Sequence, residues 1–187
     1  MGVNHIGGNI PIVISHLYQL KILNMAINKL LGSIPAEIFN ISSLEELILG
    51  DNLFSGNISI AAGALPKLKV VDLQHNKLSG EIPLSLFNMS SIRDFTLKNN
   101  NLHGSLPQDL CRHLPQLENF AITYNYFGGN IPRQIDNCTL LKGLYLGGNS
   151  FTGFIPKEIG LHLVTLRQSM DLRELFLQEE IFIVMGF

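Results

Sequence analysis

The chain has 187 residues and a formal net charge of −2, and 15% of its residues are charged against 46% that are hydrophobic. This length fits one globular domain or a short stack of repeats, and the weak negative charge excludes the basic surface that nucleic acids or anionic membranes require. No window approaches the roughly 20 uninterrupted apolar residues of a spanning helix. We therefore expect no membrane span in this chain, and its first residues show no signal-peptide pattern.

An eight-residue motif occurs seven times and organises the chain. It reads Asn, any residue, apolar, any residue, Gly, any residue, Ile or Leu, Pro, and only Ser59 departs from it, at the Pro position. The asparagines follow one another at intervals of 24 residues, with a single 25: Asn4, Asn28, Asn52, Asn76, Asn100, Asn125 and Asn149. Self-similarity at a fixed period is typical of repeat architectures.

Apolar residues precede each repeated asparagine at offsets −11, −8, −5 and −3. Before Asn76 these are Leu65, Leu68, Val71 and Leu73. The last two alternate with period two, which predicts a short strand with both side chains inward, and successive strands would pair in parallel. The sequence therefore predicts an α/β repeat solenoid with a curved parallel sheet on its concave face. Short strands, turns and 3-10 or helical pieces would form the convex face, and only a stack of such units buries the apolar residues.

Each repeated asparagine follows the predicted strand, where the chain must turn. A buried turn leaves backbone amides and carbonyls without partners, and an Asn side chain supplies two donors and an acceptor. We therefore predict a structural ladder of asparagines along the stack: Asn28, Asn52, Asn76, Asn100, Asn125 and Asn149.

The full unit, LxxLxxLxLxxNxLxGxIPxx, is the leucine-rich repeat spacing, and its LxGxIP half resembles the plant-type repeat. Segments such as LFNISSLEELILGDN and IDNCTLLKGLYLGGNSFTGFIPKEIG resemble ectodomains of plant receptor-like serine/threonine kinases. The resemblance covers residues 1–160 as seven units, the first incomplete and without the family's paired-cysteine cap. It implies a ligand-recognition module on the extracellular side of the plasma membrane, with a role in signalling or defence perception. A protein or peptide ligand, or a co-receptor ectodomain, would be its partner.

Two other functions stay open. Secreted polygalacturonase-inhibiting proteins share the same repeat, so an inhibitor of a wall-degrading enzyme is the alternative. The missing caps and leader also allow a truncated product without independent function. Kinase motifs are absent from the sequence, so we expect no catalytic activity in this chain.

The repeat pattern stops after Gly160. One interpretation is an irregular insertion at 161–171 followed by a degenerate eighth repeat at 172–187, with Glu180 at the asparagine position. The other is an amphipathic C-terminal helix over 166–180.

The concave face can be located by alternation, because residues at offsets −6, −4 and −2 point away from the core. They share no common chemistry, as expected where packing does not dictate identity. The resemblance implies that ligands bind on this surface, and the alternative is an ordinary solvated sheet. The most continuous polar patch on it is Asp72, Gln74, Asp94, Thr96, Lys98, Asn119, Thr123 and Tyr145.

Four Asn-X-Ser/Thr sequons make Asn40, Asn57, Asn88 and Asn137 candidates for glycosylation. Three of them, at 40, 88 and 137, share offset −12 on the outer arc. Sugars there would leave the concave sheet free, provided that the chain enters the secretory pathway. The alternative is that these residues only form the turns.

The remaining reactive residues suggest no catalytic or metal site. The six histidines show no paired metal spacing, and we expect no metal and no cofactor. Cys138 occupies the −11 core position, and Cys111 precedes it by 27 residues. A bridge between them requires Cα atoms within about 7 Å, which the sequence leaves open.

Overall fold

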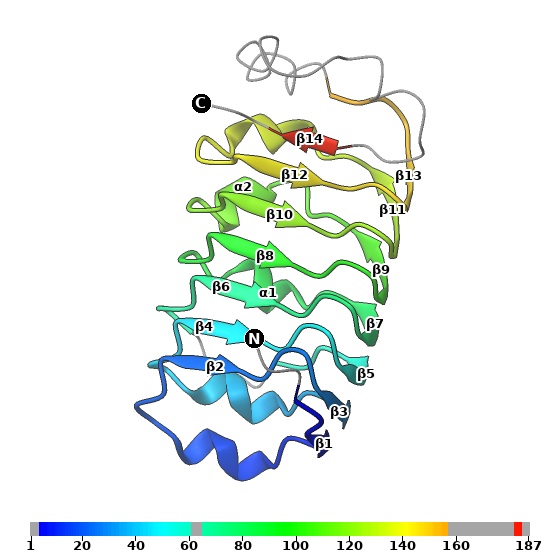
Figure 1. Ribbon diagram of the computed structural model, residues 1–187. Helices are drawn as coiled ribbons and strands as arrows, with labels where there is room; N and C mark the ends of the chain where they lie inside the picture. Colours follow the sequence, from blue (N-terminus) through cyan, green and yellow to red (C-terminus); the bar gives the residue numbers. More distant parts are fainter. Residues whose placement is uncertain (1–3, 61–64, 157–181, 185–187) are drawn as a thin grey trace.

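The computed structural model describes residues 4–60, 65–156 and 182–184. They form a stack of coils (Figure 1), in which each complete coil contributes a strand to one sheet and a strand to a second sheet. Five helical segments are found among the described residues. The predicted leucine-rich repeat solenoid is confirmed.

The first sheet lines the concave face and consists of short strands in parallel register. Val71 faces Phe95 across one pair of strands, and Phe95 faces Phe120 across the next. Its parallel strands are β2 (Ile22–Asn24), β4 (Glu46–Ile48), β6 (Val70–Asp72), β8 (Asp94–Thr96), β10 (Asn119–Ala121) and β12 (Gly143–Tyr145). These are the segments that the apolar alternation predicts.

A second parallel sheet, which we did not predict, runs along the side of the stack (Figure 1). It is built from the half of each motif that follows the asparagine, where the sequence suggested turns. Its strands are β1 (Gly7–Gly8), β3 (Lys29–Gly32), β5 (Leu53–Asn57), β7 (Lys77–Glu81), β9 (Asn101–Ser105), β11 (Tyr126–Asn130) and β13 (Ser150–Thr152). The motif glycine lies in or directly after these strands with a positive φ, for example 81° at Gly80. A Cβ there would lie 2.6 Å from the Asn57 Oδ1 of the preceding coil, so glycine is required for close stacking.

Short helical segments cover the convex face. Pro35, Pro83 and Pro132 precede three of them with φ between −57° and −62°, because the proline ring fixes the entry geometry. The segments are η1 (Ile12–His16), η2 (Ala36–Asn40), α1 (Leu84–Phe87), α2 (Leu110–His113) and η3 (Arg133–Asn137).

The core fills the space between the two sheets and the convex segments. In the coils that end at Asn52, Asn76, Asn100 and Asn125, every residue at offsets −11, −8, −5 and −3 is at most 5% exposed. Aromatic side chains stack from coil to coil, with the ring centroids of Phe95 and Phe120 5.6 Å apart. The predicted inward positions are therefore confirmed.

The asparagine side chains connect neighbouring coils. Nδ2 of Asn100 donates to Leu97 O and Lys98 O in its own coil and to Leu73 O in the preceding one, at 3.0–3.2 Å. Its Oδ1 accepts from the backbone N–H of Leu78 at 3.0 Å. The same arrangement recurs at Asn52, Asn76, Asn125 and Asn149, whereas Asn28 donates only to carbonyls of its own coil.

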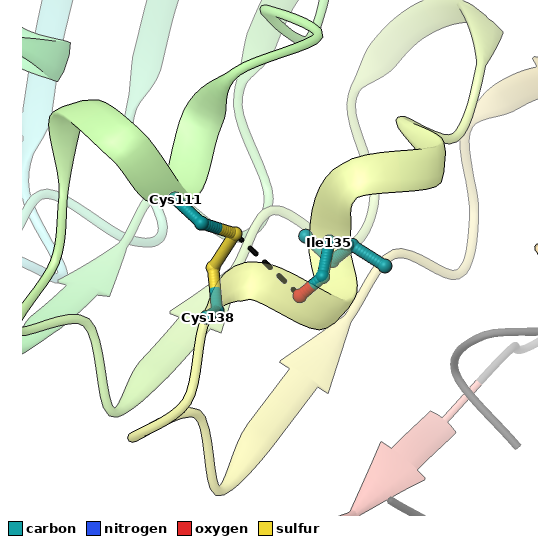
Figure 2. Close-up of a disulfide and its surroundings, with 3 residues drawn as sticks. All are labelled: Cys111, Ile135 and Cys138. Atoms are coloured by element: carbon teal, nitrogen blue, oxygen red, sulfur yellow. Dashed lines mark hydrogen bonds between the residues drawn. A yellow bond between two sulfur atoms is a disulfide. The ribbon is translucent and has the colours of Figure 1, made fainter. Parts of the chain in front are cut away.

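A disulfide joins two adjacent coils on the convex side (Figure 2). Cys111 of α2 and Cys138, directly after η3, have Cα atoms 4.8 Å apart. Both are buried, at 3% and 5% exposure. Cys138 is thus the core residue that its offset indicates and also one half of a bridge.

At the C-terminal side, β14 (Phe182–Val184) pairs antiparallel with β12. A further leucine-rich repeat would add a parallel strand. Residues 157–181, on which the degenerate repeat and the helix interpretations both depend, lie outside the described residues.

Candidate ligand-binding surface

The concave patch is on the surface of the first sheet, as alternation predicts for most of its members. Asp72, Gln74, Asp94, Thr96, Lys98, Asn119 and Tyr145 are all partly exposed. Thr123 is different, because only 4% of it is exposed, and it does not belong to the accessible part of the patch.

A contact between two long side chains spans the coil that carries Thr123. Nζ of Lys98 lies 4.9 Å from the ring centroid of Tyr145, which is two coils further along the stack. The intervening coil carries Ala121 and Thr123 at the equivalent offsets, and both are buried. Small residues in the middle coil are consistent with a cation–π contact that spans it.

Two acidic residues of the patch have short-range partners. Oδ1 of Asp94 accepts a 2.6 Å hydrogen bond from Nδ2 of Asn119, its neighbour in the next strand. The carboxylate of Asp72 accepts from the backbone N–H of Gln74 at 3.1 Å. Burial raises the pKa of Asp72, the Gln74 hydrogen bond lowers it, and the nearby charge of Asp51 raises it. The resulting pKa lies above its ordinary value.

A row of charges borders the patch where the concave strands begin, and the sequence analysis missed it. Glu45 lies between Lys69, at 2.7 Å, and Lys21, at 3.8 Å. Three coils further along, Glu118 lies between Lys142, at 2.7 Å, and Arg93, at 3.7 Å. The hydrogen bonds from Lys69 and Lys142 lower the pKa of Glu45 and of Glu118. The signal was in the sequence, because a charged residue stands at offset −7 in each of these coils.

A second row borders the patch where the strands end, at offset −1. Its residues have left-handed backbone conformations, with φ between 52° and 63°: Ile27, Asp51, His75, Asn99, Tyr124 and Gly148. His75 Nδ1 and Asn99 Nδ2 are 2.9 Å apart, and Tyr124 is 52% exposed. The two rows and the patch together form a polar surface with charged and aromatic groups that can contact a ligand.

Other features of the described residues offer no reactive site. No group of three His, Cys, Asp or Glu side chains within 4–60, 65–156 and 182–184 is placed to hold a metal ion. In the same ranges, no helix is both long enough and apolar enough to cross a membrane. A cavity of about 330 Å³ lies at the open end of the first coil, between Asn9 and Asn24, away from the concave patch.

The fold and this surface define a class of protein, the leucine-rich repeat recognition scaffolds, whose fold carries no catalytic machinery. The sequence pattern of the Leucine Rich Repeat family matches residues 67–89 and 140–161. No curated protein matches the chain.

Solved structures identify the relatives more closely. The Arabidopsis receptor kinase HAESA, solved with the peptide hormone IDA and the co-receptor SERK1, is 32% identical with a TM-score of 0.81, over 86% of this chain. PEPR1–AtPEP1 is 34% identical over 84% of the chain, with a TM-score of 0.78. The Leptospira interrogans protein LIC12759 is 29% identical over 82% of this chain and 37% of its own, with a TM-score of 0.66.

The chain is therefore a leucine-rich repeat protein that is similar to the ectodomains of plant receptor kinases. It spans 27% of the HAESA chain and 22% of the PEPR1 chain.

Proposed function

We propose that this chain is a non-catalytic recognition module that belongs to the extracellular part of a plant receptor-like kinase and binds a peptide or protein ligand on its concave surface. The observation that carries the proposal is the contrast between the two sides of the concave strands. Inward residues are uniformly apolar and buried, while the outward residues vary in chemistry from coil to coil and include the partly exposed polar side chains of the patch. Packing dictates the first set and leaves the second set free to vary, so the outward side chains are available for ligand contacts.

The similar structures support a peptide or protein as the ligand. HAESA was solved with a peptide hormone and a co-receptor, and the plant receptor RGFR1, 29% identical to this chain, is described as a peptide hormone receptor in complex with RGF2. The cation–π pair of Lys98 and Tyr145, with Asp72 and Asp94 beside it, offers a peptide both charged and aromatic contacts.

Peptide binding to matched variants tests the proposal. An array of randomised synthetic peptides is probed with the full chain, with a concave variant (Asp72→Ala, Asp94→Ala, Tyr145→Ala) and with a convex variant (Ser85→Ala, Arg112→Ala). We expect the full chain to bind some of the peptides. The affinity of these peptides for the concave variant should be lower by tenfold or more, about 1.4 kcal/mol, and their affinity for the convex variant should be unchanged. Equal binding to the wild type and the concave variant would contradict a concave site.

A further inference from the structure

Three of the four sequons occupy one structural position on the convex face. Asn40 ends η2, Asn137 ends η3, and Asn88 directly follows α1. Each asparagine is exposed, as is the Ser or Thr two residues later. The residue between them points into the core, as Ile41, Met89 and Cys138, at 0%, 5% and 5% exposure. The three sites are therefore equivalent in fold, and successive sites are two coils apart.

A covalent bond distinguishes the third site. Cys138 is the middle residue of the sequon Asn137-Cys138-Thr139, and its sulfur is bonded to Cys111 of the preceding coil (Figure 2). Ile41 and Met89 are held in the core by packing alone. Asn40 and Asn88 thus serve as internal references that lack this bond; they also have Ser42 and Ser90 where the third sequon has Thr139.

Sugar transfer requires the sequon backbone to leave its folded geometry. In the fold, Cys138 N donates to Ile135 O at 3.2 Å, and Thr139 N donates to Asn137 O at 3.0 Å. An enzyme that transfers sugar must draw these three residues into an extended segment within its own site. Unfolding of the local turn suffices at Asn40 and Asn88, whereas the disulfide keeps Cys138 attached to α2 even when the turn opens.

We propose that Asn40, Asn88 and Asn137 are N-glycosylation sites and that modification of Asn137 competes with formation of the Cys111–Cys138 disulfide. In the first reaction the Asn137 amide nitrogen loses a proton and bonds to the anomeric carbon of a lipid-diphosphate-linked oligosaccharide. The bond from that carbon to the diphosphate oxygen breaks, and the lipid diphosphate leaves. In the second, the two thiols lose two protons and two electrons to a protein disulfide oxidant, which is reduced to its dithiol.

The order of the two reactions decides the product. If the sugar is transferred before the cysteines are oxidised, Asn137 carries a sugar. If the disulfide forms first, Asn137 stays unmodified. Sugars at all three sites would cover the convex face and leave the concave patch accessible. The inference does not depend on the proposed ligand binding, since it concerns the opposite face.

Site occupancy in a secretory host tests the competition. The full chain is expressed behind a cleavable secretion signal, and peptide mass spectrometry measures the fraction of each asparagine that carries sugar. The readout is the ratio of occupancy at Asn137 to that at Asn88, with the ratio of Asn40 to Asn88 as reference. Cys111→Ala removes the bridge and keeps the sequon. Leu114→Ala destabilises the coil that carries Cys111 and leaves the bridge intact.

We expect the Asn137 ratio to be below the reference in the wild type and to rise to it in Cys111→Ala, with no rise in Leu114→Ala. An equal rise in Leu114→Ala would overturn the competition, because coil unfolding would then explain the change. A ratio that is unchanged in Cys111→Ala but raised in Cys138→Ser would also overturn it, by assigning the effect to the cysteine itself. Absence of sugar at all three asparagines would overturn the sites.

Discussion

At the scale of single residues, the ladder asparagines link the turn of one coil to the backbone of the coil before it. Asn100 makes four hydrogen bonds, two within its own coil and two to the preceding coil, and is 7% exposed. No buried side-chain nitrogen or oxygen within the described residues lacks a partner. The ladder therefore accounts for the polar groups that the sharp turns would leave unsatisfied.

Replacing Asn100 by Ala should lower the free energy of unfolding by about 1–3 kcal/mol, since buried carbonyls and an N–H lose their partners. Urea denaturation measures this loss. Lys77→Ala, at an exposed residue directly after Asn76, is the control and should change stability by less than about 0.5 kcal/mol. Equal midpoints for both variants would contradict the ladder's role.

The left-handed residues at offset −1 give a second test. Ile27 has a φ of 58° although it is β-branched, and its side chain is 43% exposed, so little packing holds it there. Asparagine tolerates this conformation, and Ile27→Asn should stabilise the protein by about 1 kcal/mol. Thermal melts measure the change.

The matched control for Ile27 is Gly148, which occupies the same offset with a φ of 63°. A Cβ there would lie 2.6 Å from Cδ1 of Tyr124, so Gly148→Ala should lose about 1 kcal/mol or more. Stabilisation by Gly148→Ala, or destabilisation by Ile27→Asn, would contradict the assigned conformations.

Asp72 makes the stability pH-dependent. Its folded pKa lies above the ordinary 3.8, chiefly because of burial, so between these two values the folded state binds more protons than the unfolded state. Stability contributed by this group is therefore present at lower pH and is lost as the pH rises through that window. Asp72→Asn removes this dependence, and the wild type should lose stability relative to the variant between the two pKa values. Denaturation midpoints from pH 3 to 7 measure the difference, and parallel pH profiles would contradict it.

At the scale of elements, the disulfide staples α2 to the turn after η3. It closes a loop of 27 residues between adjacent coils. Loop-closure entropy predicts that Cys111→Ala loses about 2–4 kcal/mol of unfolding free energy. Urea denaturation with and without reductant measures it: reductant should destabilise the wild type and leave the variant unchanged. A wild type insensitive to complete reduction would contradict the prediction.

The second sheet is a feature that the sequence pattern within one repeat does not predict. Most of its strands contain the motif glycine at positive φ, and a strand interior ordinarily disfavours glycine. Stacking reverses that preference, because the neighbouring coil's side chain, such as Asn57 over Gly80, occupies the space of a Cβ. Propensity within one repeat therefore suggests a turn, and pairing between repeats makes a strand.

At the scale of the molecule, stability depends on contacts between neighbouring coils. The first coil has fewer of them, and its large apolar side chains Ile12, Val13, Leu17, Tyr18 and Ile22 are each more than half exposed. Central coils have a neighbour on both sides. A stack of this kind should open from its weaker coils inward.

Native-state hydrogen exchange measures this gradient. We expect amide protection to be lowest in β2, which pairs with β4 alone among the described strands, and highest in β6, β8 and β10. The ladder amides Leu30 and Leu78, both hydrogen-bonded to asparagine Oδ1 atoms, offer a direct comparison of an early and a central coil. Uniform protection along the chain would indicate a single all-or-none unit instead.

The sequence alone determined the features that recur in every coil. The inward leucines, the asparagine after each strand and the motif glycine meet the same packing and turn requirements in every coil, so their repetition at a fixed period reveals them. The concave strands, the convex helical segments and the solenoid follow from these residues. The outward surface could be located as well, because alternation follows from strand geometry.

Only the tertiary structure decided the features that join different coils. The Cys111–Cys138 bridge, the Lys98–Tyr145 contact over Ala121 and Thr123, and the charge rows around Glu45 and Glu118 all connect residues 24 or more positions apart. The burial of Thr123 depends on neighbouring coils, and the sequence pattern within its own repeat does not predict it. Contacts of this kind depend on the distances and directions between stacked coils. These are set when the coils stack in the folded protein.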